Sequence, residues 1–444
     1  MPRLTLALLV ALVGCRDTHF ADLTAQPTEL VSTVIEVQWP RVDDEPGWVE
    51  LADGTVIPDR DDHPDRHRAL VAGFPQLTEI TLKAVMEIDG ERVESEPLTV
   101  ETGLLPAGLP QFTELTAAAD DLEGPFVLVP TLGDPSFVLV LNRAGEIIWY
   151  HQLGEDRQAV KAIRIPDSGD FAFLIGSGSR ALDVAEIKVL SLDGRLVEEV
   201  RAELGHHEFA HPDPDTWAWL ALDVRTVQGE GDIVGDVVVE MGADGEPRVL
   251  WSTWDTFTFE GREEPRDFYG IGYDWTHGNA LRWDAERGTY LYSTRHLSTI
   301  VELDRETGAV VDILGEQGER IAVPRDEIFQ HQHSPQYTPE GTLLVFDSRR
   351  SDAIDELSRV AEYAITTDTL ELVRTMDAAP GYHVLALGDV VRLDNGDTLS
   401  TWGTVGQLIE YDPDGKEIWR LSVGARNVLG TIQRLDSLYP SGDP

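Results

Sequence analysis

Short runs of alternating apolar and polar residues fill the chain from residue 28 to residue 101. Clear examples are residues 34–39, 68–73, 79–87 and 97–102, and polar turn residues separate them. Alternation with a period of two is typical of strands with one buried face, and turns about every ten residues indicate a β-sandwich. We therefore predict a small N-terminal sandwich domain over residues 16–103.

The strand spacing in this domain is typical of a fibronectin type III-like or immunoglobulin-like module. The sequence Gly-Leu-Leu-Pro-Ala-Gly-Leu-Pro follows at residues 103–110. Its prolines and glycines are stiff and turn-prone, which suits a connection between domains. We expect a linker at residues 104–111.

From residue 112 a different unit recurs, in which an apolar strand, a glycine-bearing turn and a second strand follow one another. Residues 137–149, 299–312 and 408–419 are examples. Glycine supplies the positive φ that such hairpins need, and a repeat of roughly 40–55 residues is typical of a propeller blade. Ring closure would leave few exposed edges. We predict an all-β fold with a six-bladed β-propeller at 112–435 and a tail at 436–444. The expected blades are residues 125–154, 160–203, 206–255, 276–315, 332–377 and 387–423.

The first 15 residues have the form of a secretory signal peptide. One arginine precedes an apolar stretch that ends in Leu12-Val13-Gly14-Cys15. These four residues resemble the lipobox of bacterial lipoproteins, so we expect export across the inner membrane and a lipid on Cys15. The anchored protein would lie in the periplasm or at the cell surface, with no other membrane contact. An ordinary signal peptide with an incidental cysteine is the alternative.

The composition excludes one class of partner. The 444 residues include 80 acidic and 35 basic ones, which gives a formal charge of −45. A surface of this charge repels nucleic acid. The single cysteine leaves no partner for an internal disulfide. An anionic substrate would therefore need a local group of cations.

Histidines gather where the predicted third, fourth and fifth blades begin. The histidines are His206, His207, His277, His331 and His333, and Asn279 lies two residues after His277. Equal positions in successive blades mean equal depth in the central channel, so we expect His207, His277 and His333 to face one pocket. Imidazole can act as base, metal ligand or nucleophile near neutral pH. Arg295, in the fourth blade, suits a tetrahedral oxyanion such as sulfate or phosphate.

Three stretches of this region carry a family resemblance. They are Asp274-Trp275-Thr276-His277-Gly278-Asn279, then Thr294-Arg295-His296, then Gln332-His333-Ser334-Pro335 with residues 341–347. In this order they resemble the motifs of the bacterial aryl-sulfate sulfotransferase family, and the similarity covers most of residues 112–430. The resemblance implies a periplasmic or surface six-bladed propeller with a small sandwich domain. It also implies transfer of a sulfuryl group from a phenolic sulfate ester to a phenol through a sulfohistidine, without nucleotide, metal or other cofactor.

The resemblance also assigns roles to residues. His333 matches the family's nucleophile. His277, Asn279 and Arg295 match the residues that hold the sulfuryl oxygens, and His207 matches the histidine of the preceding blade.

Further residues near these motifs are weaker candidates. They are His206, as the alternative to His207; His331, beside the nucleophile; His383; and the aromatic residues Tyr273, Trp275, Tyr269 and Phe268, which could stack on a phenol. Where relatives read Phe-Asp-Asn-Gly, this chain has Phe346-Asp347-Ser348-Arg349-Arg350. This departure changes the expected wall of the acceptor pocket.

The chemistry is coherent on physical grounds. A neutral imidazole can attack sulfur as a phenoxide departs, which splits one displacement into two and gives ping-pong kinetics. Fixed donors stabilise the sulfuryl oxygens, and a protonated His277 or His207 could protonate the leaving group. Two alternatives stay open: a metal-dependent hydrolase with His331 and His333 as ligands, and a non-catalytic surface propeller that binds a ligand or partner protein. Pairing of two protomers through the sandwich is one further option.

Overall fold

The structure is a computed structural model that describes residues 18–42, 45–116, 124–177, 185–262, 266–318, 327–350, 356–424 and 427–440. The predicted signal segment with Cys15 lies outside these residues, as does the end of the predicted tail. Almost every element is a strand; the helical elements of the described chain are η1 (Thr18–Phe20), α1 (Thr253–Thr256) and η2 (Gly403–Val405). Among these residues, no helix has the length and apolarity needed to cross a bilayer.

Two sheets form the N-terminal domain. One sheet has the order β1 (Thr24–Pro27), β2 (Ile35–Pro40), β5 (Arg66–Val71). The other has the order β4 (Val56–Pro58), β3 (Gly47–Leu51), β6 (Glu79–Ile88), β7 (Glu91–Glu94), with β8 (Leu98–Glu101) also on β6. Alternate residues of both sheets, such as Val37, Trp39, Val49 and Leu82, meet in one buried cluster. Two sheets around one buried cluster are what the predicted sandwich requires; the sandwich domain, its bounds and its fibronectin-like or immunoglobulin-like type stay predictions.

In the residues that the structure describes after the linker, six further sheets occur, and we refer to them as blades 1 to 6 in chain order. Blade 1 contains β12 (Ile147–Gln152), β11 (Phe137–Asn142) and β10 (Phe126–Leu132), with β34 (Val428–Leu429) and β35 (Gln433–Leu435) on β10. Blade 2 contains β13 (Arg157–Arg164), β14 (Phe171–Ser177), β15 (Ala185–Leu190) and β16 (Leu196–Ala202). Blade 3 contains β17 (Gly205–Asp213), β18 (Thr216–Val227), β19 (Gly231–Met241) and β20 (Pro247–Ser252), with β21 (Tyr273–Asp274) on β19.

The remaining three blades have the same order. Blade 4 contains β22 (Gly278–Asp284), β23 (Thr289–Thr294), β24 (Thr299–Asp304) and β25 (Val310–Gly315). Blade 5 contains β26 (His333–Tyr337), β27 (Leu343–Asp347), β28 (Arg359–Ile365) and β29 (Leu370–Met376). Blade 6 contains β30 (Asp389–Arg392), β31 (Thr398–Trp402), β32 (Gln407–Tyr411), β33 (Glu417–Val423) and, at its outer edge, β9 (Phe112–Thr116). The prediction of an all-β propeller is confirmed.

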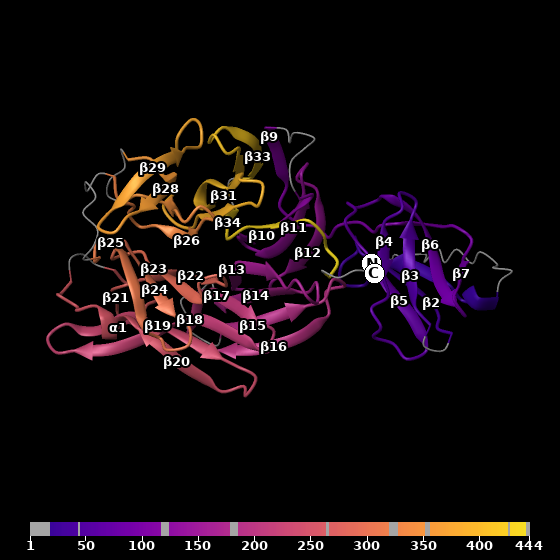
Figure 1. The fold of residues 1–444 in the computed structure, drawn as a ribbon, viewed down its shortest axis with the longest axis horizontal. Helices are drawn as coiled ribbons and strands as arrows, with labels where there is room; N and C mark the ends of the chain where they lie inside the picture. Colours follow the sequence, from indigo (N-terminus) through magenta and orange to yellow (C-terminus); the bar gives the residue numbers. More distant parts are fainter. Residues whose placement is uncertain are drawn as a thin grey trace, which may run out of the picture.

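The two ends of this ring are joined by exchanged strands. β9, the first strand after the linker, pairs with β33 of blade 6. β34 and β35, the last strands of the chain, pair with β10 and complete blade 1 on its inner side. The ring therefore closes through main-chain hydrogen bonds, because strands from each end of the chain pair with the blade formed by the other end. Figure 1 shows β9 and β33 together beside β10, β11 and β12.

Local sequence explains the hairpins within the blades. The glycines of three predicted turns, Gly145, Gly308 and Gly415, have φ values of 80°, 70° and 83°. These values lie in the left-handed region, where glycine pays no steric cost. Apolar clusters then fill the spaces between neighbouring blades, and large side chains such as Trp149, Trp219 and Trp402 are fully buried in them.

The sandwich contacts blade 1 and blade 2 directly (Figure 1). Val34 and Leu70 join the apolar cluster of blade 1, and the Thr33 hydroxyl donates to the carbonyl of Ile148 over 2.7 Å. Arg68 forms a buried ion pair with Asp193 of blade 2. These contacts hold the domain against the side of the ring.

Candidate active site

The sequence-predicted site residues lie where the innermost strands of blades 3, 4 and 5 begin. The strand register shifts between His206 and Phe209 in β17, between Gly278 and Ala280 in β22, and after His333 in β26. Such irregularities redirect side chains next to active sites. They turn side chains of three different blades toward one another.

Several of these residues have an unusual backbone conformation. His207, His277, His331 and Ser334 have φ values of 52°, 50°, 48° and 49°. A positive φ is uncommon for residues other than glycine, and it costs on the order of 1–3 kcal/mol unless the surroundings impose it. The clustering of four such residues at one end of the channel is typical of a functional site.

Asp236 of β19 fixes the positions of two of these segments. One carboxylate oxygen accepts hydrogen bonds from the Thr276 hydroxyl, from the Tyr292 hydroxyl over 2.8 Å and from the Gly278 backbone N–H over 2.8 Å. The other oxygen lies 3.1 Å from His206 Nε2. The carboxylate thus holds the residues on both sides of His277 by hydrogen bonds, and it lies close to His206, the residue before His207.

The chemistry of Asp236 follows from its burial and these donors. Burial acts to raise the pKa of its carboxyl, but the interactions with His206, Thr276 and Tyr292 outweigh burial and lower it. The group is therefore a buried anion. Gly278 allows the close approach, because a Cβ at that position would lie 2.7 Å from Tyr292 and 3.0 Å from the Asp236 carboxyl.

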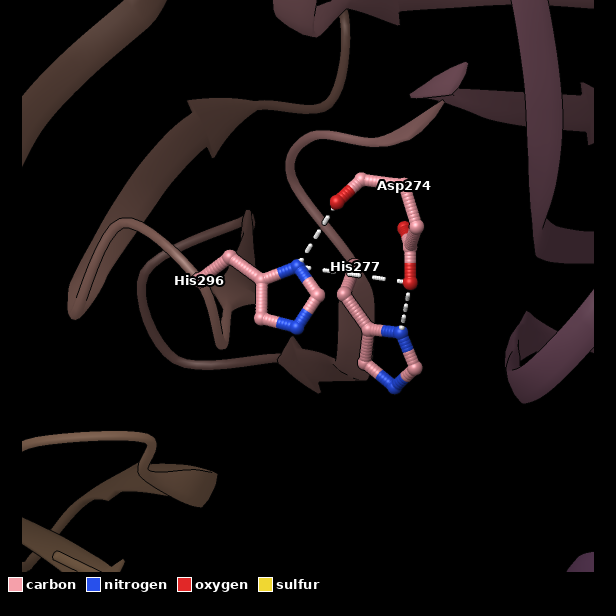
Figure 2. A group of neighbouring side chains, drawn as sticks. All are labelled: Asp274, His277 and His296. Atoms are coloured by element: carbon pink, nitrogen blue, oxygen red, sulfur yellow. Dashed lines mark hydrogen bonds and ion pairs between the residues drawn. The ribbon is translucent and has the colours of Figure 1, made fainter. Parts of the chain in front are cut away.

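A second carboxylate, Asp274, orients two histidines (Figure 2). Its Oδ2 lies 2.6 Å from His277 Nδ1, and its backbone carbonyl lies 2.9 Å from His296 Nδ1. An Nδ1–H that donates to Asp274 leaves the lone pair of a neutral ring on Nε2. In Figure 2 the Nε2 atoms of both rings lie on the side away from Asp274.

His206 and His207 form a short chain of ring contacts with the same group. Their Nδ1 atoms are 3.0 Å apart, and the Tyr269 hydroxyl lies 3.3 Å from His206 Nδ1. The His207 ring lies 5.0 Å from the His277 ring, measured between centroids. Blades 3 and 4 thus bring both predicted histidines together.

His333 begins β26 and is buried. Its Nδ1 lies 3.2 Å from the Ser348 hydroxyl, and a hydrogen bond donated from Nδ1 leaves the lone pair on Nε2. Ser348 belongs to residues 346–350, the stretch at which the sequence analysis expects an altered wall of the acceptor pocket. The next residue, Arg349, turns away and pairs with Asp347 over 3.2 Å and with Glu356.

Asn279 connects blades 4 and 5. Its side-chain N–H donates to the carbonyl of Gln332 over 2.7 Å, and its buried Oδ1 has no hydrogen-bond partner among the described residues. Gln332, between the two histidines of blade 5, is itself held by Ser293 over 2.9 Å. This contact fixes the segment that carries His333.

The site is electrostatically unfavourable to protonated imidazole. Burial lowers the pKa of His333 well below its usual value, and the charges of Arg295, His277 and His331 act in the same direction. Burial likewise lowers the pKa of His207, with His277, His206, His333 and Arg295 adding to the effect. The pKa of His296 is lowered too, mainly by burial. His333 and His207 are therefore neutral near pH 7.

Arg295 is the nearby cation. Its guanidinium donates to the carbonyl of Leu385 over 3.3 Å, and its charge reaches both His207 and His333. It supplies local positive charge in a protein of charge −45.

The predicted aromatic residues separate into two groups. Phe268 and Tyr269 lie against His277, with ring centroids 4.9 Å and 5.9 Å away. Tyr273 and Trp275 pack instead in an apolar cluster with Ile233. The substrate contacts predicted for these two residues gain no support from this packing.

His383 was a further candidate from the sequence. Its Nδ1 lies 3.0 Å from the backbone carbonyl of Glu356.

Sequence reasoning missed Asp236, Asp274 and Ser348 as site residues. Asp236 had a detectable signal, because it is the one charged residue in the apolar run 233–239. A carboxylate at such a position must find buried partners. Ser348 had none, since its contact with His333 depends on how β26 and β27 pair.

Asp274, His277 and His296 also form a group of potential metal ligands, whose ligand atoms lie within 4.8 Å of one another. Two imidazoles and a carboxylate are a donor set that suits Zn²⁺. The metal alternative raised by the sequence therefore has a better location here than at His331 and His333.

Comparison with known proteins gives one clear match. A family model described as Arylsulfotransferase (ASST) matches residues 112–423, which is well over half of the chain. No curated protein matches.

Similar solved structures are distant. A protein of unknown function from Bacteroides caccae has 16% identity and a TM-score of 0.44, over 69% of this chain and 98% of that one. A chain of a nidogen/laminin complex has 13% identity and a TM-score of 0.44, over 70% and 99%. Streptogramin B lyase has 10% identity and a TM-score of 0.39, over 69% and 86%. No inference about activity rests on them.

The Asp236 contacts generate a prediction about stability. We expect Asp236→Asn to lower the free energy of unfolding by about 3 kcal/mol, because the amide places an N–H group among buried donors and removes the charge they stabilise. Chemical denaturation followed by tryptophan fluorescence measures the change.

Glu240→Gln is the matched control on the same strand. Glu240 also accepts from a tyrosine and lies near a cation, Tyr290 at 2.8 Å and Arg305 at 2.9 Å, but its side chain is 14% exposed. We expect a loss of about 1 kcal/mol or less there. Equal losses in the two variants would contradict the role given to Asp236.

Proposed function

The chain belongs to the arylsulfotransferase (ASST) family, and from that membership we propose that it transfers a sulfuryl group from an aryl sulfate to a phenol through a covalent intermediate on His333. The observation that carries the proposal is the state of His333: buried, lowered in pKa and oriented by Ser348. A neutral imidazole with its lone pair on Nε2 is a nucleophile at neutral pH. The proposed substrates are small molecules, a phenolic sulfate ester as donor and a phenol as acceptor.

The first step forms one bond and breaks one. The His333 Nε2 lone pair attacks sulfur, the bond from sulfur to the phenolic oxygen breaks, and the phenoxide leaves with the electron pair. In the second step an acceptor phenol gives its proton to His277, which became neutral when it protonated the first phenoxide, and the phenol oxygen attacks sulfur. The N–S bond then breaks, which restores neutral His333 and releases the new ester. Donor and acceptor use the site in turn, so the kinetics are ping-pong.

The sulfuryl oxygens need donors in both steps. Arg295, His277 and Asn279 are assigned this role. One N–H of the Asn279 amide is already engaged by Gln332, so its second N–H is the available donor. Donors held in place before the reaction stabilise developing charge without reorganisation, and loss of one such donor costs roughly 10²–10³ in rate.

Protonation of the leaving phenoxide is assigned to His277. The lowered pKa of His207 makes it a poor acid near pH 7. In its protonated form His277 donates one N–H to Asp274, whose carboxylate lies 2.6 Å from its Nδ1, and it carries a second N–H at Nε2 that can act as donor and acid. His207 then serves to position a donor or the substrate.

His333→Ala is expected to abolish turnover of an aryl sulfate such as 4-nitrophenyl sulfate, because the proposed bond to sulfur forms at the His333 Nε2. His331→Ala is the matched control, two residues away and also buried, and should keep most of the activity. Rapid quenching with donor alone should add the mass of one sulfuryl group to the peptide that contains His333. An active His333→Ala variant, or the added mass on another peptide, would sink the assignment. An inactive wild-type protein would favour the non-catalytic alternative.

A metal-dependent hydrolase is the second candidate, favoured by the group Asp274, His277 and His296. The two sulfuryl-transfer steps proposed for His333 need no metal. We expect extended dialysis against a chelator to leave the transfer rate unchanged. Loss of activity on dialysis, with recovery on addition of Zn²⁺, would establish the metal mechanism instead.

Export and lipid anchoring through Cys15 complete the proposal, on the basis of residues 12–15 alone. Cys15→Ser should move the protein from the membrane fraction to the soluble fraction of a bacterial host, because no thiol is left to lipidate. Fractionation followed by immunoblotting measures this. A soluble wild-type protein would show an ordinary signal peptide.

A further inference from the structure

The ring of His207 has a single hydrogen-bond partner among the described residues, and that partner is its neighbour in the chain. Its Nδ1 lies 3.0 Å from Nδ1 of His206. The His333 ring, by contrast, contacts the hydroxyl of Ser348 on the far side of a hairpin. The position of the His207 ring therefore depends on its backbone and on the packing of neighbouring rings.

The backbone at His207 is irregular. The register of β17 against β18 shifts between His206 and Phe209, so the two residues between them, His207 and Glu208, pair with no residue of β18. His207 also has a φ of 52°, which residues other than glycine seldom adopt. A segment of this kind keeps its shape only when its surroundings impose it.

The carboxylate of Glu208 ties this irregular segment to another blade. Glu208 is 1% exposed, and its Oε2 lies 2.6 Å from the ammonium group of Lys161, on β13 of blade 2. The same ammonium group donates to the Leu281 carbonyl of β22 over 3.2 Å and lies 5.8 Å from the centre of the Phe209 ring. One side chain of blade 2 thus contacts the irregular segment of blade 3 and the strand of blade 4 that carries Asn279.

Burial makes the pair of Lys161 and Glu208 a strong constraint. It raises the pKa of the Glu208 carboxyl, and the charge of Lys161 is the strongest of the influences that lower this pKa. A buried ion that loses its partner keeps its desolvation cost without the compensating attraction. Neither side chain can therefore move away without a large cost, and the backbone next to His207 is held with them.

We propose that Lys161 and Glu208 are positioning residues of the candidate site, whose ion pair fixes the irregular segment of β17 and so holds the His207 imidazole against the ring of His277. Any effect of the pair on turnover rests on the proposed transfer reaction, whereas the position of His207 can be measured without it. Blade 2, which contributes no residue to the histidine group, thereby takes part in building the site.

The first measurement follows the His207 ring directly. Isotope-labelled histidine gives one imidazole signal per ring in a proton–carbon NMR spectrum of the whole protein, and the His207 signal is the one lost in His207→Ala. Glu208→Gln keeps the shape of the side chain and removes its charge. We expect it to shift the His207 signal and to leave the signal of His67, in the N-terminal domain, in place. An unmoved His207 signal would overturn the proposal, whether or not the protein transfers sulfuryl groups.

The second measurement tests whether His207 carries the effect on turnover. Glu208→Gln and Lys161→Met should each lower kcat for an aryl sulfate by roughly tenfold or more, because misplacement of a group in the site is costly. In a His207→Ala background the same changes should lower kcat by no more than about twofold, since residues that act through one side chain have non-additive effects. Equal losses in the two backgrounds would show that the pair acts on the fold in general and would overturn the proposal.

Glu410→Gln is the matched control. Glu410 is also fully buried and is ion-paired with Arg143 and Arg434, but its strand, β32, contributes no residue to the candidate site. The change should lower the melting temperature, as Glu208→Gln does, and should leave both the His207 signal and kcat unchanged. The same shift and the same loss of kcat in Glu410→Gln would overturn the proposal.

Failure of the proposed reaction looks different from failure of this inference. A wild-type protein that transfers no sulfuryl group, but whose His207 signal moves in Glu208→Gln and not in Glu410→Gln, would refute the reaction and support the positioning role.

Discussion

Closure of the ring is the constraint on which the rest of this structure depends. A sheet with two apolar faces is stable only when both are covered, and here each blade is covered by its two neighbours. The last contact is made by exchange of strands, β9 to blade 6 and β34 with β35 to blade 1. Closure also directs the inner strands to one channel. Side chains that lie more than 100 residues apart, such as His207 and His333, become neighbours only for this reason.

Within that frame, fixed carboxylates determine how the histidines are oriented. Asp236 holds the segment on each side of His277, and Asp274 holds His277 itself. These contacts offset the cost of the positive φ angles at His207 and His277. A nucleophile and its donors must stay in position while charge moves from one oxygen to another, and rigid anchoring on several blades provides this.

Buried ionisable groups are in different states in the two halves of the channel. At the histidine end, burial and Arg295 keep His333 and His207 neutral, which suits nucleophilic attack. At the far end, buried cations are balanced by carboxylates behind them, such as Glu208 and Glu362. The strongly acidic exterior therefore says little about the candidate site, which depends on the few charges placed inside the ring.

The sequence alone determined the fold class and indicated most of the residues that gather at the candidate site. Alternation of apolar and polar residues indicates which face of a strand is buried. Gly145, Gly308 and Gly415 mark turns, because these turns need a positive φ. Strands and hairpins could therefore be predicted from short stretches of sequence. Motif order indicated His207, His277, Asn279, Arg295 and His333. Only the tertiary structure decided that Asp236, Asp274 and Ser348 position these side chains, and that Phe268 and Tyr269, not Tyr273 and Trp275, lie against His277. The strands that close the ring were equally out of reach of the sequence. These features depend on strand register, on bulges and on contacts between blades. The residues that make them lie far apart in the sequence, and no pattern within a short stretch predicts which of them will come into contact.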